Sequence, residues 1–175
     1  MPVKFSSHLS FLPIKKKKMT VPQPIIDLLK LREGFRSDVY LDTVGKPTAG
    51  MGHLLSSEEL AQYPVGTVVP DDVLNEWIQD DTVACYVAGM SQARQIGSSD
   101  SRLINALSCV SFQLGAYWYN KFPHCWNALK AHNWQQAANE AQDSEWYKQT
   151  PVRVEDFQNV LYSLGQPATA ASHIG

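Results

Sequence analysis

The chain has 175 residues, of which 44% are hydrophobic and 18% are charged. This composition is typical of one folded globular domain and excludes an intrinsically disordered chain. The longest apolar runs span only a few residues, which excludes a transmembrane helix.

The net charge of −2 is unevenly distributed along the chain. Residues 1–18 contain five lysines, Lys4 and Lys15 to Lys18, and no acidic residue, whereas residues 19–175 carry 10 basic and 17 acidic side chains. Phosphate contacts need clustered Lys and Arg, so we expect no nucleic-acid partner. We expect the lysine run to be solvated; the alternative is a weak contact of this arm with an anionic membrane surface.

The first predicted elements are a helix and a hairpin. Apolar residues recur at helical spacing from Ile25 to Glu33, with Pro24 suited to the first turn and Gly34 to the stop. Val39 and the residues after it, with turn signals over 42–47, predict a β-hairpin, and a further short strand fits between 51 and 55.

The rest of the chain is predicted to be helical. Ser56 with the acids after it starts one helix, and Asp100 is a candidate N-cap for a central core helix that ends near Leu114. The other predicted helices span about 70–90, 122–131, 134–142 and 151–164. The fold class is therefore α+β with helices dominant, organised as a basic extension (1–24), one domain (25–164) and a C-terminal tail (165–175).

The three cysteines, Cys85, Cys109 and Cys125, each fall in a predicted helix among apolar neighbours. None forms a Cys-x-x-Cys pair, so we expect buried free thiols and neither a disulfide framework nor a metal site. We expect no cofactor.

Two carboxylates and a threonine stand out by their spacing. Glu33 ends the first helix, Asp42 follows nine positions later in the hairpin, and Thr48 comes six positions after that. Alone, each is ordinary: a helix-end glutamate, a turn aspartate and a strand threonine. Together they supply the two carboxyl groups that cleavage of a glycosidic bond needs, one to protonate the leaving oxygen and one to act on water or sugar.

The spacing resembles the Glu-x8-Asp-x5-Thr pattern of the phage T4-type lysozymes (endolysins, glycoside hydrolase family 24). The similarity runs over roughly residues 25–164 and includes three further blocks, Gly50–Leu54, Asn105–Gly115 and Trp146–Arg153. The resemblance implies a lysozyme-like fold, with a small hairpin lobe, a helical lobe and a cleft between them.

The resemblance also implies roles for individual residues. Glu33 would be the general acid, and Asp42 the base that holds a water with Thr48, in an inverting hydrolysis. Arg153 would lie beside Glu33, and His53 would have a structural, ion-paired role. The helix dipole at Glu33 favours its protonated form, as a general acid requires, whereas the arginine opposes this.

The family's sugar-binding positions are matched unevenly. Leu54 and Phe112 agree with the family, whereas Cys125 and Glu140 stand where it has a serine and an asparagine. Glu145 replaces a cleft arginine. The aromatic run 117–119 replaces a family loop, and we expect it to serve packing, with sugar stacking as the alternative.

The resemblance therefore implies an N-acetylmuramidase for bacterial cell lysis by a phage, whose partner is the glycan strand of peptidoglycan. We expect a monomer held in the host cytoplasm until release to the wall, since residues 1–24 lack a signal-peptide pattern, or else carried on the virion. Two alternatives remain open: a catalytically silent lysozyme-fold module that binds cell wall or serves virion assembly, and a membrane-active protein that uses only its lysine arm. The sequence also leaves open whether Met19 is the natural start.

Overall fold

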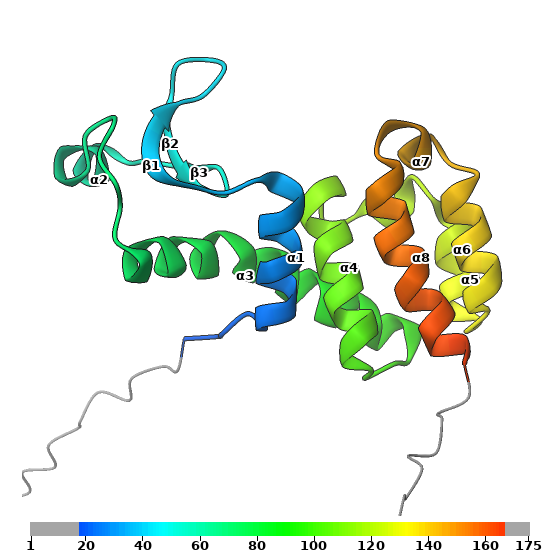
Figure 1. The fold of residues 1–175 in the computed structure, drawn as a ribbon. Coiled ribbons are helices and arrows are strands. Elements are labelled where there is room, and N and C mark those ends of the chain that lie inside the picture. The colour runs from blue at the N-terminus through cyan, green and yellow to red at the C-terminus, as the bar shows by residue number, and fades with distance from the viewer. Residues whose placement is uncertain (1–17, 167–175) are drawn as a thin grey trace, which may run out of the picture.

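A computed structural model describes residues 18–166, so the predictions for residues 1–17 and 167–175 lie outside it. Figure 1 shows the order of the elements along the chain. They are α1 (Gln23–Glu33), β1 (Arg36–Leu41), β2 (Pro47–Gly50), β3 (His53–Leu54), α2 (Ser57–Gln62), α3 (Asp71–Ile96), α4 (Ser101–Leu114), the 3-10 helix η1 (Trp118–Asn120), α5 (Pro123–Lys130), α6 (Trp134–Gln142), α7 (Glu145–Gln149) and α8 (Pro151–Gly165). None of these helices is long and apolar enough to cross a membrane.

The small lobe is an antiparallel sheet of order β1-β2-β3 with α2 beside it. The sheet packs on the N-terminal half of α3 through a core that contains Val39, Ala49, Leu74 and Trp77. The helix α2 begins with a capping box, because Ser56 accepts from the backbone N–H of Glu59 and the Glu59 carboxylate accepts from that of Ser56. The predicted hairpin, short third strand and helix start are thus confirmed.

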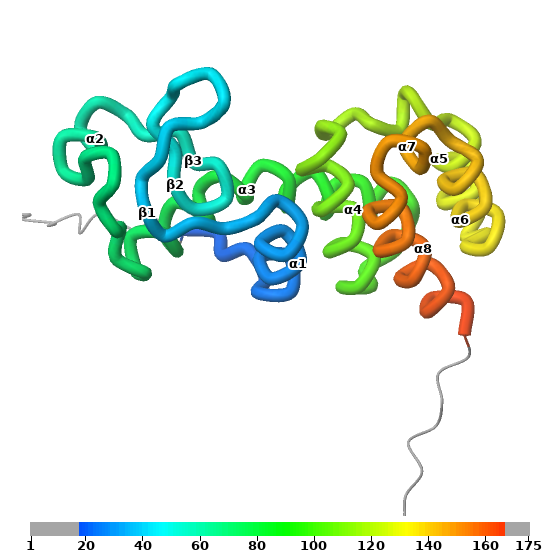
Figure 2. The backbone as a smooth tube through the Cα atoms, turned by 45° about the horizontal axis from the view of Figure 1, so that its top comes forward, coloured from blue at the N-terminus to red at the C-terminus, as the bar shows by residue number. Residues whose placement is uncertain are grey.

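The long helix α3 joins the small lobe to the large helical lobe, as Figures 1 and 2 show from two directions. It runs to Ile96, six residues beyond the predicted end near Met90, because residues 91–96 contain no Gly or Pro. Gly97 has a left-handed backbone (φ 80°) and closes the helix with its N–H on the carbonyls of Ala93 and Arg94. The α+β fold with dominant helices is confirmed.

The large lobe surrounds a core that combines aliphatic and aromatic side chains. Trp118 is 1% exposed and makes edge or tilted contacts with Trp126, Trp146 and Phe157. The elements η1 and α7, of three and five residues, were not predicted, since such short helices show no apolar periodicity. The other helices of this lobe were predicted within two residues of their observed bounds.

Residues just before α1 pack onto the domain, although the sequence analysis placed them in the extension. Val21 is 1% exposed, and its backbone N–H and carbonyl both bond the side-chain amide of Gln79 on α3. Lys18 pairs with Asp80 (2.6 Å) and Glu76 (3.5 Å) on the same helix. This segment therefore anchors the start of α1 to α3.

The three cysteines are free thiols in α3, α4 and α5; Cys85 and Cys125 are buried, as predicted, whereas Cys109 is only half-buried. Desolvation raises the pKa of Cys85 to about 11 and the pKa values of Cys109 and Cys125 to about 12. All three thiols are therefore protonated at neutral pH and poorly nucleophilic.

We predict that Gly89→Ala destabilises the protein. A Cβ at Gly89 would lie 2.2 Å from Ser108 Oγ and 2.8 Å from the Ile104 carbonyl oxygen, where α3 crosses α4. Because the obstruction includes backbone, the overpacking cost of about 1–3 kcal/mol should exceed the gain of about 1 kcal/mol in helix propensity. Urea unfolding measures the difference. Gly165→Ala is the control, since its Cβ would meet only Trp134 at 3.8 Å, and equal stability of the two variants would contradict the expected clash.

Candidate functional site

Glu33 is the last residue of α1, which ends because Gly34 adopts a positive φ of 81°. Its side chain is 29% exposed and pairs with Arg153, which is 13% exposed. Nη2 of Arg153 donates to Oε1 of Glu33, and within residues 18–166 no hydrogen bond reaches Oε2. The expected pairing of Arg153 with Glu33 is confirmed, and Glu33 keeps one carboxyl oxygen available.

Arg153 is placed by the start of α8. Pro151 opens the helix after Thr150, whose hydroxyl accepts from Nε2 of Gln113 (2.9 Å). The other end of the Gln113 amide accepts from Nε1 of Trp146 (3.0 Å). Gln113 thus joins α4, α7 and α8 beneath the ion pair. The sequence analysis did not single out this residue, although it lies inside the block Asn105–Gly115.

Asp42 and Thr48 are brought together at the hairpin turn by hydrogen bonds to the same residue. Oδ1 of Asp42 accepts from the backbone N–H groups of Val44 (2.9 Å) and Lys46 (2.8 Å), while the Thr48 hydroxyl donates to the carbonyl of Lys46 (3.1 Å). Within the described part of the chain no hydrogen bond reaches Oδ2 of Asp42. Thr48 is 4% exposed. The turn therefore holds both side chains still and leaves one carboxylate oxygen free.

The same turn sets the charge of Asp42. Hydrogen bonds from backbone N–H groups, that of Lys46 above all, lower the pKa of its carboxyl group below the usual value. Asp42 is therefore ionised at neutral pH, which a base or an electrostatic partner requires.

His53 on β3 links the sheet to α2 and to the long helix α3. Its Nδ1 lies 2.9 Å from Asp81 of α3 and its Nε2 3.3 Å from Glu59 of α2, and its ring stacks on Trp77 at 4.4 Å. The carboxylate of Asp81 is the main cause that raises the pKa of His53. The ion-paired, structural environment expected for His53 is what the structure shows.

The proposed sugar-binding positions differ in exposure. Leu54 on β3 is 52% exposed, and Phe112 on α4 is partly buried against the core below α1. Cys125 is 2% exposed, and its thiol donates to the Ala137 carbonyl (3.4 Å). Glu140 lies on α6 and accepts from Gln136 (2.7 Å), in the part of the large lobe that Figure 1 shows farthest from the sheet. The burial of Cys125 and the position of Glu140 count against direct sugar contacts by these two residues.

The aromatic run splits between core and surface. Trp118 is buried, and Tyr119 stacks on Trp126 at 4.6 Å, so both serve packing as expected. Tyr117 is 73% exposed, which keeps the sugar-stacking alternative open for this residue.

Comparison with known sequences decides the family. Residues 30–159, which contain Glu33, Asp42, Thr48 and Arg153, match the sequence profile of the family described as Phage lysozyme. The chain belongs to the phage lysozyme family.

Individual relatives place this lysozyme-family domain in proteins of different size. The chain is 30% identical over 125 residues to the peptidoglycan hydrolase gp36 of Pseudomonas phage phiKMV, an alignment that covers 71% of this chain and 14% of gp36. It is 28% identical to the pre-baseplate central spike protein Gp5 of Enterobacteria phage T4, over 73% of this chain and 25% of Gp5. The chain therefore spans only a minor part of these two. It is also 29% identical to probable T4-type lysozyme 2 of Dictyostelium discoideum, over 73% of this chain and 86% of that protein.

Within residues 18–166 no group of three or more His, Cys, Asp or Glu side chains is placed to hold a metal ion.

We predict that the His53 contacts stabilise the fold most in acid. Because the pKa of His53 is raised in the folded state, its contribution is fully present below the unfolded pKa of about 6.5 and is lost as the pH rises through the folded pKa. The difference in unfolding free energy between wild type and His53→Gln should therefore shrink from pH 5.5 to pH 9. Asp81→Asn should remove most of this pH dependence while the stacking on Trp77 persists, and a difference that is flat with pH would contradict the ion-pair contribution.

Proposed function

We propose that this chain is a peptidoglycan hydrolase, an N-acetylmuramidase that cleaves the β-1,4 bond between N-acetylmuramic acid and N-acetylglucosamine. The observation that carries the proposal is the pair of separately held carboxyl groups, each with one oxygen free, inside the segment that matches the phage lysozyme family. The name of the relative gp36 supports the same substrate class.

Glu33 is the general acid in this proposal. Arg153 holds Oε1 and stabilises the negative charge that remains on the carboxylate after proton transfer. The free Oε2 is then the atom that delivers the proton to the leaving glycosidic oxygen.

Asp42 and Thr48 act on water in this proposal. Oδ2 of Asp42 accepts a proton from the attacking water, and the Thr48 hydroxyl, which already donates to the Lys46 carbonyl, accepts a hydrogen bond from that water with its remaining lone pair. Attack by a water activated on the opposite face of the sugar inverts the anomeric configuration. A lytic transglycosylase uses the sugar's own hydroxyl and needs no such water.

Leu54, Phe112 and Tyr117 are the proposed glycan contacts, since each presents some apolar surface. Cys125 and Glu140 would act only through the packing of α5 and α6. We further propose that the protein acts as a monomer in bacterial lysis by a phage, from the host cytoplasm or from the virion; the relative Gp5, named as a spike protein, favours keeping the virion route.

We predict that Glu33→Gln and Asp42→Asn each lower the rate of peptidoglycan cleavage by about 10²-fold or more, because each keeps the side-chain shape and removes proton transfer or charge. Release of reducing sugar ends from purified peptidoglycan measures the rate, and urea unfolding checks the fold. The exposed Glu58→Gln and Asp72→Asn are matched controls with unchanged rates.

Near-normal turnover in either site variant would remove that residue from the mechanism. A wild-type chain that binds peptidoglycan without cleaving it would identify the silent wall-binding or assembly module instead. Anhydro sugar ends in the product, detected by mass spectrometry, would replace hydrolysis by transglycosylation, and α-configured first product, detected by NMR, would support inversion.

We propose a weak contact of the Lys15–Lys18 arm with anionic membranes, and we predict that it depends on salt. A protein that starts at Met19 loses these lysines and should bind anionic vesicles less at low salt, whereas screening at high salt should abolish the difference. Co-sedimentation with vesicles measures binding, with neutral vesicles as the control. Equal binding by the two proteins would make the arm inert, and lysis of cells by Glu33→Gln would favour the purely membrane-active alternative.

A further inference from the structure

We propose that the ion pair between Arg32 and Asp156 is a positioning device for Glu33, and this inference rests on the proposed role of Glu33 as general acid. Arg32 is the penultimate residue of α1, directly before Glu33, and Asp156 lies on α8, three residues after Arg153. Two adjacent charges on one helix end are thus matched by two charges on one turn of another helix.

The geometry of the pair is that of a rigid clamp. Nε of Arg32 donates to Oδ2 of Asp156 and Nη2 donates to Oδ1, both at 2.7 Å. The side chains are 26% and 21% exposed, so water screens the pair only partly. Bidentate bonds between a guanidinium and a carboxylate fix orientation as well as distance.

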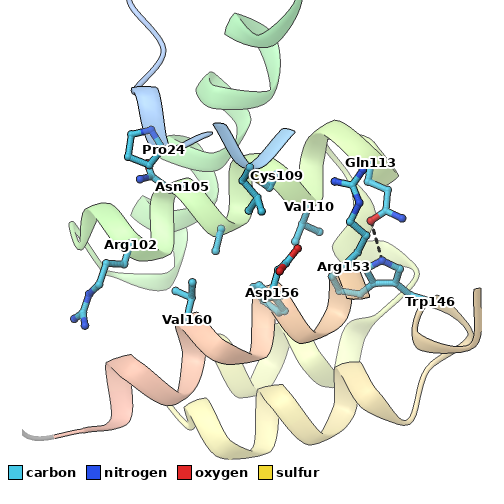
Figure 3. A pocket seen from close by; sticks show the side chains of 13 residues that line it. Pro24, Arg102, Asn105, Cys109, Val110, Gln113, Trp146, Arg153, Asp156 and Val160 are labelled. Carbon is cyan, nitrogen blue, oxygen red and sulfur yellow. Dashed lines mark hydrogen bonds between the residues drawn. The ribbon is translucent and has the colours of Figure 1, made fainter. Parts of the chain in front are cut away.

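Apart from this clamp and the Glu33–Arg153 pair, a cavity separates α1 from α8. The apolar face of α1, with Ile25 and Leu29, packs toward α3 and α4. Between α1, α4 and α8 lies a cavity of about 230 Å³, lined by Leu28 of α1 and Phe157 of α8 among others. Figure 3 shows this cavity with Asp156 and Arg153 on its α8 side.

A second hollow, of about 310 Å³, lies on the surface where α1 ends and α8 begins, and Leu31, Arg32, Val152 and Arg153 line it. Because space lies on both sides of the charged contacts, little direct packing joins the end of α1 to α8. There the two ion pairs join the helices, each of which also packs on α4. A shift of about 1 Å at a reacting group can cost on the order of 10²-fold in rate, so the clamp matters for the carboxyl group next to it.

The clamp also balances the charge around Glu33. The elements around Glu33 carry several charged or titratable groups, among them Lys30 and Arg32 of α1, Arg36 of β1, Cys109 of α4, and Arg153, Glu155 and Asp156 of α8. The carboxylate of Asp156 neutralises Arg32, so Arg153 remains the main cation that acts on Glu33. Without Asp156, a second free cation beside Glu33 would favour its ionised form and oppose proton donation.

The two halves of the pair therefore make opposite predictions for the pH profile. Asp156→Asn removes a negative charge near Glu33, favours its ionised form and moves the alkaline limb of kcat to lower pH. Arg32→Gln removes a positive charge and moves the same limb to higher pH. Both variants lose the clamp, so both should lower kcat about tenfold at the optimum with KM within twofold of wild type.

The double variant Arg32→Gln with Asp156→Asn separates position from charge. Its alkaline limb should return close to that of wild type while its kcat stays as low as in the single variants. Arg102→Gln is the matched control, since Arg102 makes a bidentate pair with Asp100 and lies at the far end of the same cavity from Arg153 (Figure 3). This control should lower stability without moving the limb.

The test measures cleavage rates on soluble peptidoglycan fragments from pH 4 to pH 9. Circular dichroism at the assay temperature checks that each variant is folded. Wild-type kcat and an unmoved limb in both folded single variants would overturn the positioning role while Glu33→Gln stays inactive. An active Glu33→Gln would instead overturn the proposed acid itself. Lower melting temperatures with an unmoved limb would show that the pair is only structural.

Discussion

Glu33 stands at the negative end of α1 and Arg153 at the positive end of α8, so each charge lies where its own helix disfavours it. Their contact relieves both positions at once, which makes the meeting of these helix ends the interaction on which the arrangement of the site depends. Neighbouring side chains hold the two helix ends in place for this contact. Gln113 holds Thr150 at the start of α8, and the packing of Ile25 and Leu29 fixes α1 against α3 and α4.

The hairpin that carries Asp42 and Thr48 belongs to a different packing unit. It rests on the N-terminal half of α3 through the core around Trp77, and His53 ties β3 to α2 and α3. The long helix α3 is the shared support of both units, because its C-terminal half packs closely on α4 where Gly89 allows the approach. Glu33 and Asp42 are thus held by separate sets of contacts, and both sets rest on the same helix, α3.

The acidic balance of the folded part has a structural explanation. Acids on the N-terminal half of α3 hold other parts of the molecule: Glu76 and Asp80 pair with Lys18, and Asp81 pairs with His53. Near Glu33 the charges are instead paired between α1 and α8. The net charge of the chain therefore says little about the charge at the candidate site.

The sequence by itself determined most of the helices and strands. Helical and alternating periodicities, Pro24, Gly34 and the cap at Asp100 act within a few residues, so they can be recognised without knowledge of the fold. The spacing of Glu33, Asp42 and Thr48 indicated the family and the reaction class. Only the tertiary structure decided that Gln113 supports Thr150 and that Arg32 meets Asp156. That last pair is 124 positions apart in the chain, and such contacts arise only when packing brings distant helices together.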